Sequence, residues 1–151
     1  MLKETKVTSS CRPFMVLSLL IFAGLLAACT GGQQEPYTTE SGLTIQVLKR
    51  GRGDKALSGH TVTVHYTVWL EDGTLVESSK EEYGGSGAAH QRRLGAGQMV
   101  AGLEEGAIGM REGEIRKLIC PPELAYGDRG SGDKIPPNAT LIFEIELIRV
   151  R

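Results

Sequence analysis

Residues 61–70, TVTVHYTVWL, alternate between two sets of side chains. Val62, Val64, Tyr66 and Val68 fall on one face, and Thr61, Thr63, His65 and Thr67 on the other. A period of two, rich in β-branched residues, predicts a half-buried β-strand. The dipeptide Asp72-Gly73 follows and predicts a hairpin turn, with the return strand beginning at Thr74. His65 is therefore expected on the outer face, away from Tyr66.

The remainder of the chain predicts further strands and one helix. Residues 114–120 and 141–147 have strand-like patterns, and residues 91–94 predict a short edge strand behind a glycine-rich loop over residues 80–89. Helical spacing is confined to residues 99–110, where internal glycines weaken the helix, so it needs a sheet to pack against. These elements predict an α+β fold, an antiparallel β-sheet curled around one short α-helix.

Composition and residue spacing exclude several classes of function. The chain has 151 residues, a length typical of one domain, and a formal net charge of −1 without a long run of one sign. Nucleic-acid binding relies on clustered Lys and Arg, so we expect no nucleic-acid partner. Cysteine and histidine spacing shows no metal site, and Gly95-Ala96-Gly97 lacks the following glycine of a dinucleotide loop. We therefore expect neither a metal nor a cofactor.

The N-terminus has the pattern of an export signal. A basic start precedes an apolar run over residues 14–26, which is shorter than the roughly 20 residues of a membrane-spanning helix. The run ends in Leu26-Ala27-Ala28-Cys29. This motif resembles the bacterial lipobox, in which the cysteine is diacylated before the signal peptide is removed. We therefore expect a lipoprotein signal peptide over residues 1–28 and lipidation at Cys29.

The expected mature protein is a lipid-anchored domain of the cell envelope. Residues 29–41 are polar and predict a flexible tether, followed by the folded domain over residues 42–151. Thr30 is not the aspartate that typically retains such lipoproteins in an inner membrane. The sequence thus predicts an outer-membrane anchor facing the periplasm if the cell is Gram-negative. Cys120, at the end of a strand, is expected to be a buried, unreactive thiol.

Five sequence blocks in order resemble FKBP-type peptidyl-prolyl cis-trans isomerases, in a bacterial lipoprotein form. The resemblance spans residues 43–150. It rests on these motifs: Val64-His65-Tyr66-Thr67; Leu70-Glu71-Asp72-Gly73 with Ser78-Ser79; Gly102-Leu103-Glu104-Glu105-Gly106; Pro121-Pro122-Glu123-Leu124-Ala125-Tyr126-Gly127; and Ile135-Pro136-Pro137-Asn138-Ala139-Thr140-Leu141-Ile142-Phe143. It implies rotation of X-Pro bonds in exported polypeptides, without a covalent nucleophile, by a protein that we expect to be monomeric.

The resemblance also implies a site. Carried over block by block, the catalytic residues are Tyr66, Glu77, Leu103, Tyr126 and Phe143, and the substrate-binding residues are Val76, Met99, Val100 and Ile135. Leu103 would form the floor under the proline ring, with Tyr66 and Phe143 as walls. The Tyr126 hydroxyl and the Val100 N–H would donate hydrogen bonds to substrate carbonyls.

Several positions depart from the family pattern. The family usually has aromatic residues at positions 76, 90 and 103, where this chain has Val76, His90 and Leu103, and it usually has aspartate in place of Glu77. We expect low catalytic efficiency from these changes. Two alternatives stay open: a catalytically weak proline-peptide binding module or chaperone on a lipid tether, and a structural lipoprotein that uses Trp69 on its outer face.

Overall fold

The computed structural model describes residues 34–151. The expected signal peptide, the lipidation site Cys29 and the first residues of the expected tether lie outside the described residues. No helix in the described part of the chain is long and apolar enough to cross a membrane.

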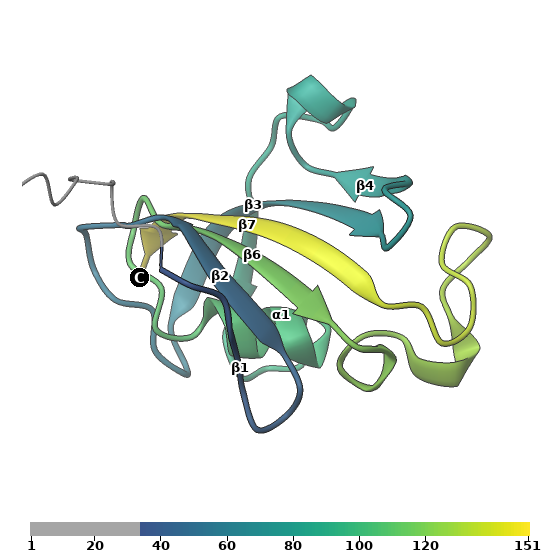
Figure 1. The fold of residues 1–151 in the computed structure, drawn as a ribbon. Coiled ribbons are helices and arrows are strands. Elements are labelled where there is room, and N and C mark those ends of the chain that lie inside the picture. Colours follow the sequence, from purple (N-terminus) through teal and green to yellow (C-terminus); the bar gives the residue numbers. More distant parts are fainter. Residues whose placement is uncertain (1–33) are drawn as a thin grey trace, which may run out of the picture. The chain divides into compact units, whose positions relative to one another are not determined.

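In the described part of the chain, seven strands form one sheet in which every pairing is antiparallel (Figure 1). Their order is β1-β2-β6-β7-β3-β4, and β5 pairs with the first half of β3. The strands are β1 (Tyr37–Thr38), β2 (Thr44–Lys49), β3 (Thr61–Leu70), β4 (Leu75–Ser78), β5 (His90–Arg93), β6 (Ile115–Cys120) and β7 (Leu141–Val150).

Among residues 34–151 there is one α-helix, α1 (Ala101–Ala107), which packs against β6 and β7 on the inner face of the sheet (Figure 1). Three short 3₁₀ helices lie in the connections: η1 (Glu81–Tyr83), η2 (Pro122–Leu124) and η3 (Gly127–Arg129). The α+β architecture expected from the sequence is confirmed, and β3 has the bounds that its alternation predicts.

The helix is shorter than the predicted range of residues 99–110. Val100 is extended and serves as the N-cap, while Ile108 is also extended and Gly109 has a φ of +82°. The backbone therefore leaves the helical conformation at both ends. Within α1, a methyl group on Gly106 would collide with the side chain of Leu118. The glycines that weaken the helix thus let it approach the sheet closely.

Other boundaries also differ from prediction. Tyr37–Thr38 pairs with β2, and the Thr39 N–H donates to the Leu43 carbonyl, so ordered structure begins inside the segment expected to be tether. β5 is shifted by one residue from residues 91–94. β7 continues three residues beyond Leu147, because Arg149 and Val150 still pair with β3 after the pairing with β6 has ended.

The core lies between α1 and the inner face of the sheet. It contains the inward-facing residues of the long strands together with α1 residues. Cys120 is fully buried within it, as expected, and burial, together with the charge of Glu105, raises the pKa of its thiol to about 12. At neutral pH the thiol is protonated, which makes it a poor nucleophile.

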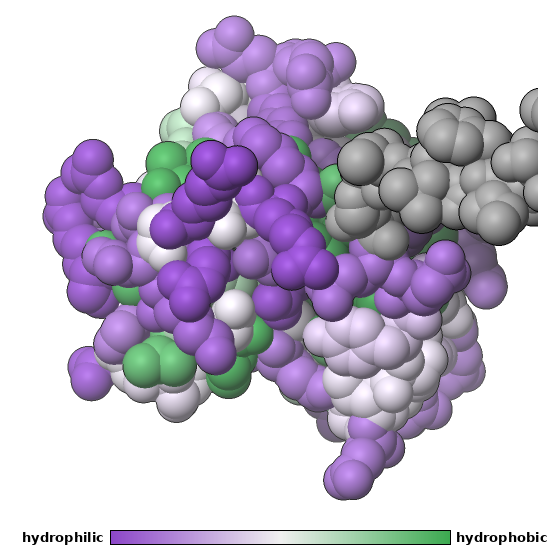
Figure 2. Space-filling model, turned by 60° about the vertical axis from the view of Figure 1, so that its left-hand side comes forward, coloured by the Kyte–Doolittle hydropathy of each residue, from purple (hydrophilic) through white to green (hydrophobic). Residues whose placement is uncertain are grey.

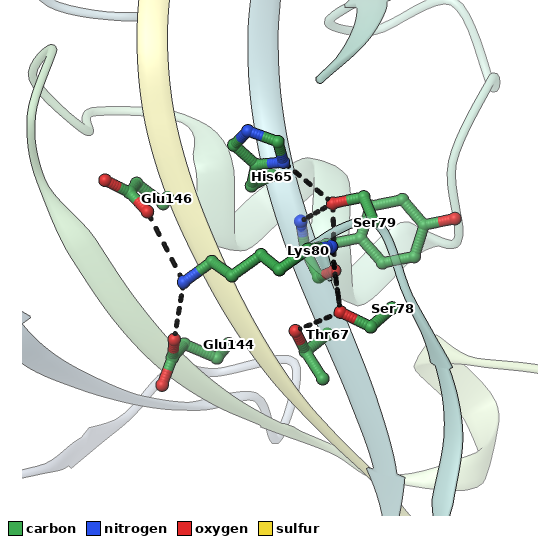
Figure 3. A network of polar contacts seen from close by, with 8 residues as sticks. His65, Thr67, Ser78, Ser79, Lys80, Glu144 and Glu146 are labelled. Atoms are coloured by element: carbon green, nitrogen blue, oxygen red, sulfur yellow. Dashed lines mark hydrogen bonds and ion pairs between the residues drawn. The ribbon is translucent and has the colours of Figure 1, made fainter. Parts of the chain in front are cut away.

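The outer face of the sheet is polar and partly covered by the segment after β4. Figure 3 shows Lys80 extending between Glu144 and Glu146 of β7, with N–O distances of 3.0 and 3.4 Å. His65 faces this side, as predicted, and its Nδ1 lies 3.1 Å from the Ser79 hydroxyl. These contacts fix the segment that joins β4 to η1.

A structural lipoprotein that contacts its partner through Trp69 would need this side chain to be exposed, and Trp69 is less accessible than that. It is half-buried, and its ring forms a T-shaped contact with the Tyr83 ring, with ring centroids 5.7 Å apart and an interplanar angle of 89°. On the face shown in Figure 2, hydrophilic residues predominate and hydrophobic ones appear only in small separate areas. The part of that face that the grey atoms leave visible shows no large apolar patch.

Candidate functional site

A cavity of about 210 Å³ opens between the inner face of the sheet and the start of α1. All nine residues that the sequence assigned to the site line it. They come from separate parts of the chain: Tyr66 on β3, Val76 and Glu77 on β4, Met99, Val100 and Leu103 at the start of α1, Tyr126 before η3, Ile135 in the following loop, and Phe143 on β7. Their roles in catalysis stay predictions.

Leu103 and Phe143 are the most deeply set side chains among the predicted site residues. They are 5% and 4% exposed. Phe143 faces inward because β7 alternates between buried and half-buried residues, and Leu103 lies on the buried side of α1. Both residues belong to the hydrophobic core and also line the cavity, so the bottom of the cavity is apolar and rigidly packed.

One wall carries a hydrogen bond between two predicted catalytic residues. The Tyr66 hydroxyl donates to Glu77 Oε1 over 3.0 Å. Burial raises the pKa of Tyr66 to about 12, with the Glu77 hydrogen bond and charge as further causes. The phenol is thus neutral at physiological pH, and the longer glutamate side chain still reaches it.

Two groups are placed to donate to a ligand. Val100 is the N-cap of α1, whose carbonyl accepts from Leu103 and Glu104, and no acceptor is recorded for its own N–H within residues 34–151. Tyr126 is 41% exposed, and its hydroxyl has no hydrogen-bond partner in the described chain. Both donors border the cavity.

A lysine joins the two sides of the cavity mouth. Lys134 Nζ donates to the Val76 carbonyl over 3.0 Å and so connects the loop after η3 to β4. The next residue, Ile135, is held by paired backbone hydrogen bonds with Ser131. This arrangement keeps Ile135 and Val76 at the cavity although they lie far apart in the sequence.

A buried ion pair holds the other end of α1. Arg116 Nε lies 2.6 Å from Glu114 Oε1, and Arg116 Nη1 donates to the carbonyls of Gly106 and Ile108. These carbonyls are at the C-terminal end of α1, where the helix supplies no further N–H donors of its own. Arg116 therefore anchors the helix that carries Leu103.

The sequence reasoning missed part of the lining. Val64, Val68, Arg92 and Gln98 also border the cavity, as does His90, which was noted only as a departure from the family. The His90 ring lies 5.3 Å from the Tyr66 ring at 54°. A signal was present: the alternation in residues 90–93 places His90 and Arg92 on one face, and both are half-buried.

No three His, Cys, Asp or Glu side chains in the described part of the chain are grouped closely enough to hold a metal ion. The groups that line the cavity supply an apolar floor, hydrogen-bond donors at its edge, the Glu77 carboxylate and the Arg92 guanidinium.

The comparisons with known proteins agree with this geometry. Residues 53–148 match the model of a family described as FKBP-type peptidyl-prolyl cis-trans isomerase. The "FK506-binding protein" of Neisseria meningitidis serogroup B is 48% identical over 109 residues, covering 72% of this chain and 96% of that protein. The human "Peptidyl-prolyl cis-trans isomerase FKBP2" is 39% identical over 140 residues, covering 90% and 96%.

Two solved structures share the fold. FkpA from Escherichia coli superposes with a TM-score of 0.68 at 36% identity, covering 77% of this chain and 51% of that one. AtFKBP13 superposes with a TM-score of 0.69 at 35% identity, covering 78% and 100%. The chain thus spans about half the length of FkpA and the whole of AtFKBP13. With the fold, the cavity and the family model in agreement, the chain belongs to the FKBP-type peptidyl-prolyl cis-trans isomerases.

Proposed function

We propose that this protein is a lipid-anchored prolyl isomerase that assists the folding of exported proteins. FKBP domains bind proline-containing peptides, and the family supplies the isomerase reaction. The proposal that the protein is lipid-anchored and acts on exported proteins rests on its N-terminal sequence. The basic start, the apolar run and the Cys29 motif are typical of bacterial lipoproteins. A single copy contains every predicted pocket residue, which supports a monomer as the working form.

The reaction that the cavity performs is rotation about a C–N bond. The uncatalysed step is slow because amide resonance must be broken. A twisted amide has lost conjugation and is less polar than a planar one, so an apolar site favours the transition state over the ground state. In this proposal the proline ring binds above Leu103, with Phe143 and Tyr66 as the walls that shield it from water; the three side chains line the cavity, and Leu103 and Phe143 are buried.

Hydrogen bonds hold the peptide while the bond turns. The Tyr126 hydroxyl and the Val100 N–H, neither of which has a recorded acceptor in the described chain, donate to substrate carbonyls on either side of the proline. The Glu77 carboxylate accepts a hydrogen bond from the Tyr66 hydroxyl and so fixes the direction of the phenol. No covalent bond to the protein forms in this scheme.

The observation that carries the isomerase proposal is the convergence of nine predicted residues on one cavity with a buried apolar floor. The test is the rate of cis-trans exchange of a Leu-Pro peptide with and without the protein, measured by NMR exchange spectroscopy. Acceleration at substoichiometric protein supports the enzyme. Saturable peptide binding without acceleration would support the binding-module alternative instead.

The lipid anchor is tested separately. Cells that express the full chain are grown with a fatty-acid analogue, and incorporation into the protein is measured. We expect label in the wild type and in Cys11→Ser, whose cysteine precedes the cleavage site, but none in Cys29→Ser. Undiminished label in Cys29→Ser would contradict the proposal. Because Thr30 follows the cysteine, we expect the labelled protein in the outer-membrane fraction of a Gram-negative host.

A further inference from the structure

The cavity has opposite charges at its two ends. β4 pairs with the second half of β3, where Glu77 lies opposite Val68, and β5 pairs with the first half, where Arg92 lies opposite Val62. Tyr66 lies between these two points on the same strand. The cavity lining therefore carries a carboxylate at the β4 end and a guanidinium at the β5 end.

No carboxylate among the described residues pairs with Arg92. Within residues 34–151 the recorded hydrogen bond of its guanidinium is from Nη1 to the Gln91 carbonyl over 2.8 Å. The remaining N–H groups of the guanidinium fork have no recorded acceptor there, and such a fork matches a carboxylate in geometry. A substrate group can supply the missing acceptor.

The other charged and polar groups near the cavity do not change the sign of the charge at the β5 end. Glu77 is engaged by the Tyr66 hydroxyl at the opposite end. Lys134 donates to the Val76 carbonyl at that same end and does not line the cavity. His90 lies next to Arg92 on the inner face of β5, against the Tyr66 ring, and Gln98 is uncharged. The charge at the β5 end is therefore positive.

The reach of Arg92 defines where an acidic group must lie. Tyr66 and Val62 are four residues apart on β3, or roughly 13 Å at about 3.3 Å per residue. A long arginine side chain covers part of this separation from the β5 side. With the proline ring above Leu103, beside Tyr66, a substrate side chain one or two residues from the proline spans the rest.

We propose that Arg92 is a specificity-determining residue that makes this isomerase favour substrates with an acidic side chain one or two residues from the proline. The inference rests on the proposed isomerase function and names its substrate class. It applies to this chain because Arg92 and His90 occupy inward-facing positions of β5 that would otherwise extend the apolar wall of the cavity.

The experiment compares matched peptides that differ in one side chain. Glutamate, glutamine or lysine is placed at each of the two positions before and the two positions after the proline, and kcat/KM is measured by NMR exchange. We expect at least one position at which glutamate exceeds glutamine about threefold to tenfold, between the effects of a screened ion pair and a charge-assisted hydrogen bond. Raising the salt concentration should reduce this ratio.

Variants of Arg92 test whether this side chain causes the preference for glutamate peptides. In Arg92→Gln the glutamate-to-glutamine ratio should fall to about one, and in Arg92→Glu the lysine peptide should become preferred over the glutamate peptide. Arg93→Gln is the matched control, because Arg93 is the adjacent exposed residue on the other face of β5. It should leave the ratio of the wild type unchanged.

Two results would overturn the proposal: no position with a ratio above one in the wild type, or a ratio that persists in Arg92→Gln. These failures are distinct from failure of the isomerase function, which appears as no acceleration of any peptide, including Leu-Pro. In that case the same ratio, taken from the peptide dissociation constants of wild type and Arg92→Gln, decides the role of Arg92 independently of turnover.

Discussion

The Tyr66 hydroxyl donates a hydrogen bond to the Glu77 carboxylate across the β3–β4 pair, with 3.0 Å between the two oxygens. The pair forms one wall of the cavity and orients the phenol, and burial together with Glu77 keeps the phenol protonated well above physiological pH. A phenol that stays protonated and oriented does not place a charge beside the proline. An apolar site needs this condition to favour the less polar, twisted amide.

The Tyr66–Glu77 pair predicts a pH dependence of stability. The folded state raises the pKa of Tyr66 from 10.0 to about 12, mainly through burial and then through Glu77, so it holds the phenolic proton more tightly than the unfolded chain. The resulting stabilisation is complete below pH 10 and is lost as pH rises from 10 to 12. The difference in free energy of unfolding between wild type and Tyr66→Phe should shrink over this window, measured by denaturant titration. If the difference in free energy of unfolding between the two proteins is constant from pH 9 to 12, the prediction is contradicted.

Tyr126→Phe should lower the isomerase activity and leave the stability of the fold nearly unchanged. The Tyr126 hydroxyl has no partner in the described chain, so its removal should change the free energy of unfolding by less than about 0.5 kcal/mol. If it anchors a substrate carbonyl, kcat/KM should fall about two- to tenfold, as for a hydrogen bond worth roughly 0.5–1.5 kcal/mol. Tyr83→Phe is the matched control, because Tyr83 is also 41% exposed but lies away from the cavity. Equal activity in both variants would argue against the anchoring role.

Lys134→Met should loosen the cavity mouth. The substitution removes the donor to the Val76 carbonyl, so the loop that carries Ile135 is no longer connected to β4. We expect a higher KM for Leu-Pro peptides, and a loss of stability no larger than one hydrogen bond, roughly 0.5–1.5 kcal/mol. Lys134→Arg, which keeps a donor, should recover most of the affinity. The exposed Lys55→Met serves as control and should match the wild type.

Arg116→Met should destabilise the whole domain. It leaves the Glu114 carboxylate buried without its partner and removes the donor from the Gly106 and Ile108 carbonyls. Breaking a buried pair in this way costs about 3–5 kcal/mol. Urea denaturation of Arg116→Met and of Lys117→Met, the adjacent residue on the outer face, measures the difference. The double variant Glu114→Gln/Arg116→Met should recover part of the loss, and a loss below about 1 kcal/mol in the single variant would refute this role of Arg116.

The long strands could be predicted from the sequence because each buries one face. The alternation in residues 61–70 gives β3 its bounds, and the same period identifies β6 and the start of β7. β1 was not predicted, since its two residues are exposed and depend on pairing with β2. β2 was also missed, although Ile45 and Val47 alternate, because the run is short and ends in charged residues.

The cavity floor could be located from the family resemblance, whereas its charged end could not. Leu103 and Phe143 lie in motifs that the family shares, so the resemblance assigns them. Arg92 belongs to no such motif, and its position depends on which residue of β3 it pairs with. The ends of α1 were also mispredicted, since apolar spacing continues through Met110 although the backbone turns at Gly109.

The central claim is that this cavity rotates X-Pro bonds by desolvating them above Leu103. The most direct measurement is the cis-trans exchange rate of a Leu-Pro peptide, followed by NMR with substoichiometric wild type and with Leu103→Trp. We predict acceleration by the wild type and greater acceleration by Leu103→Trp, whose flat ring restores a broader floor; unfolding is followed in parallel because overpacking can cost about 1–3 kcal/mol. An exchange rate equal to that of the free peptide, with the peptide bound to folded wild type, would contradict the account.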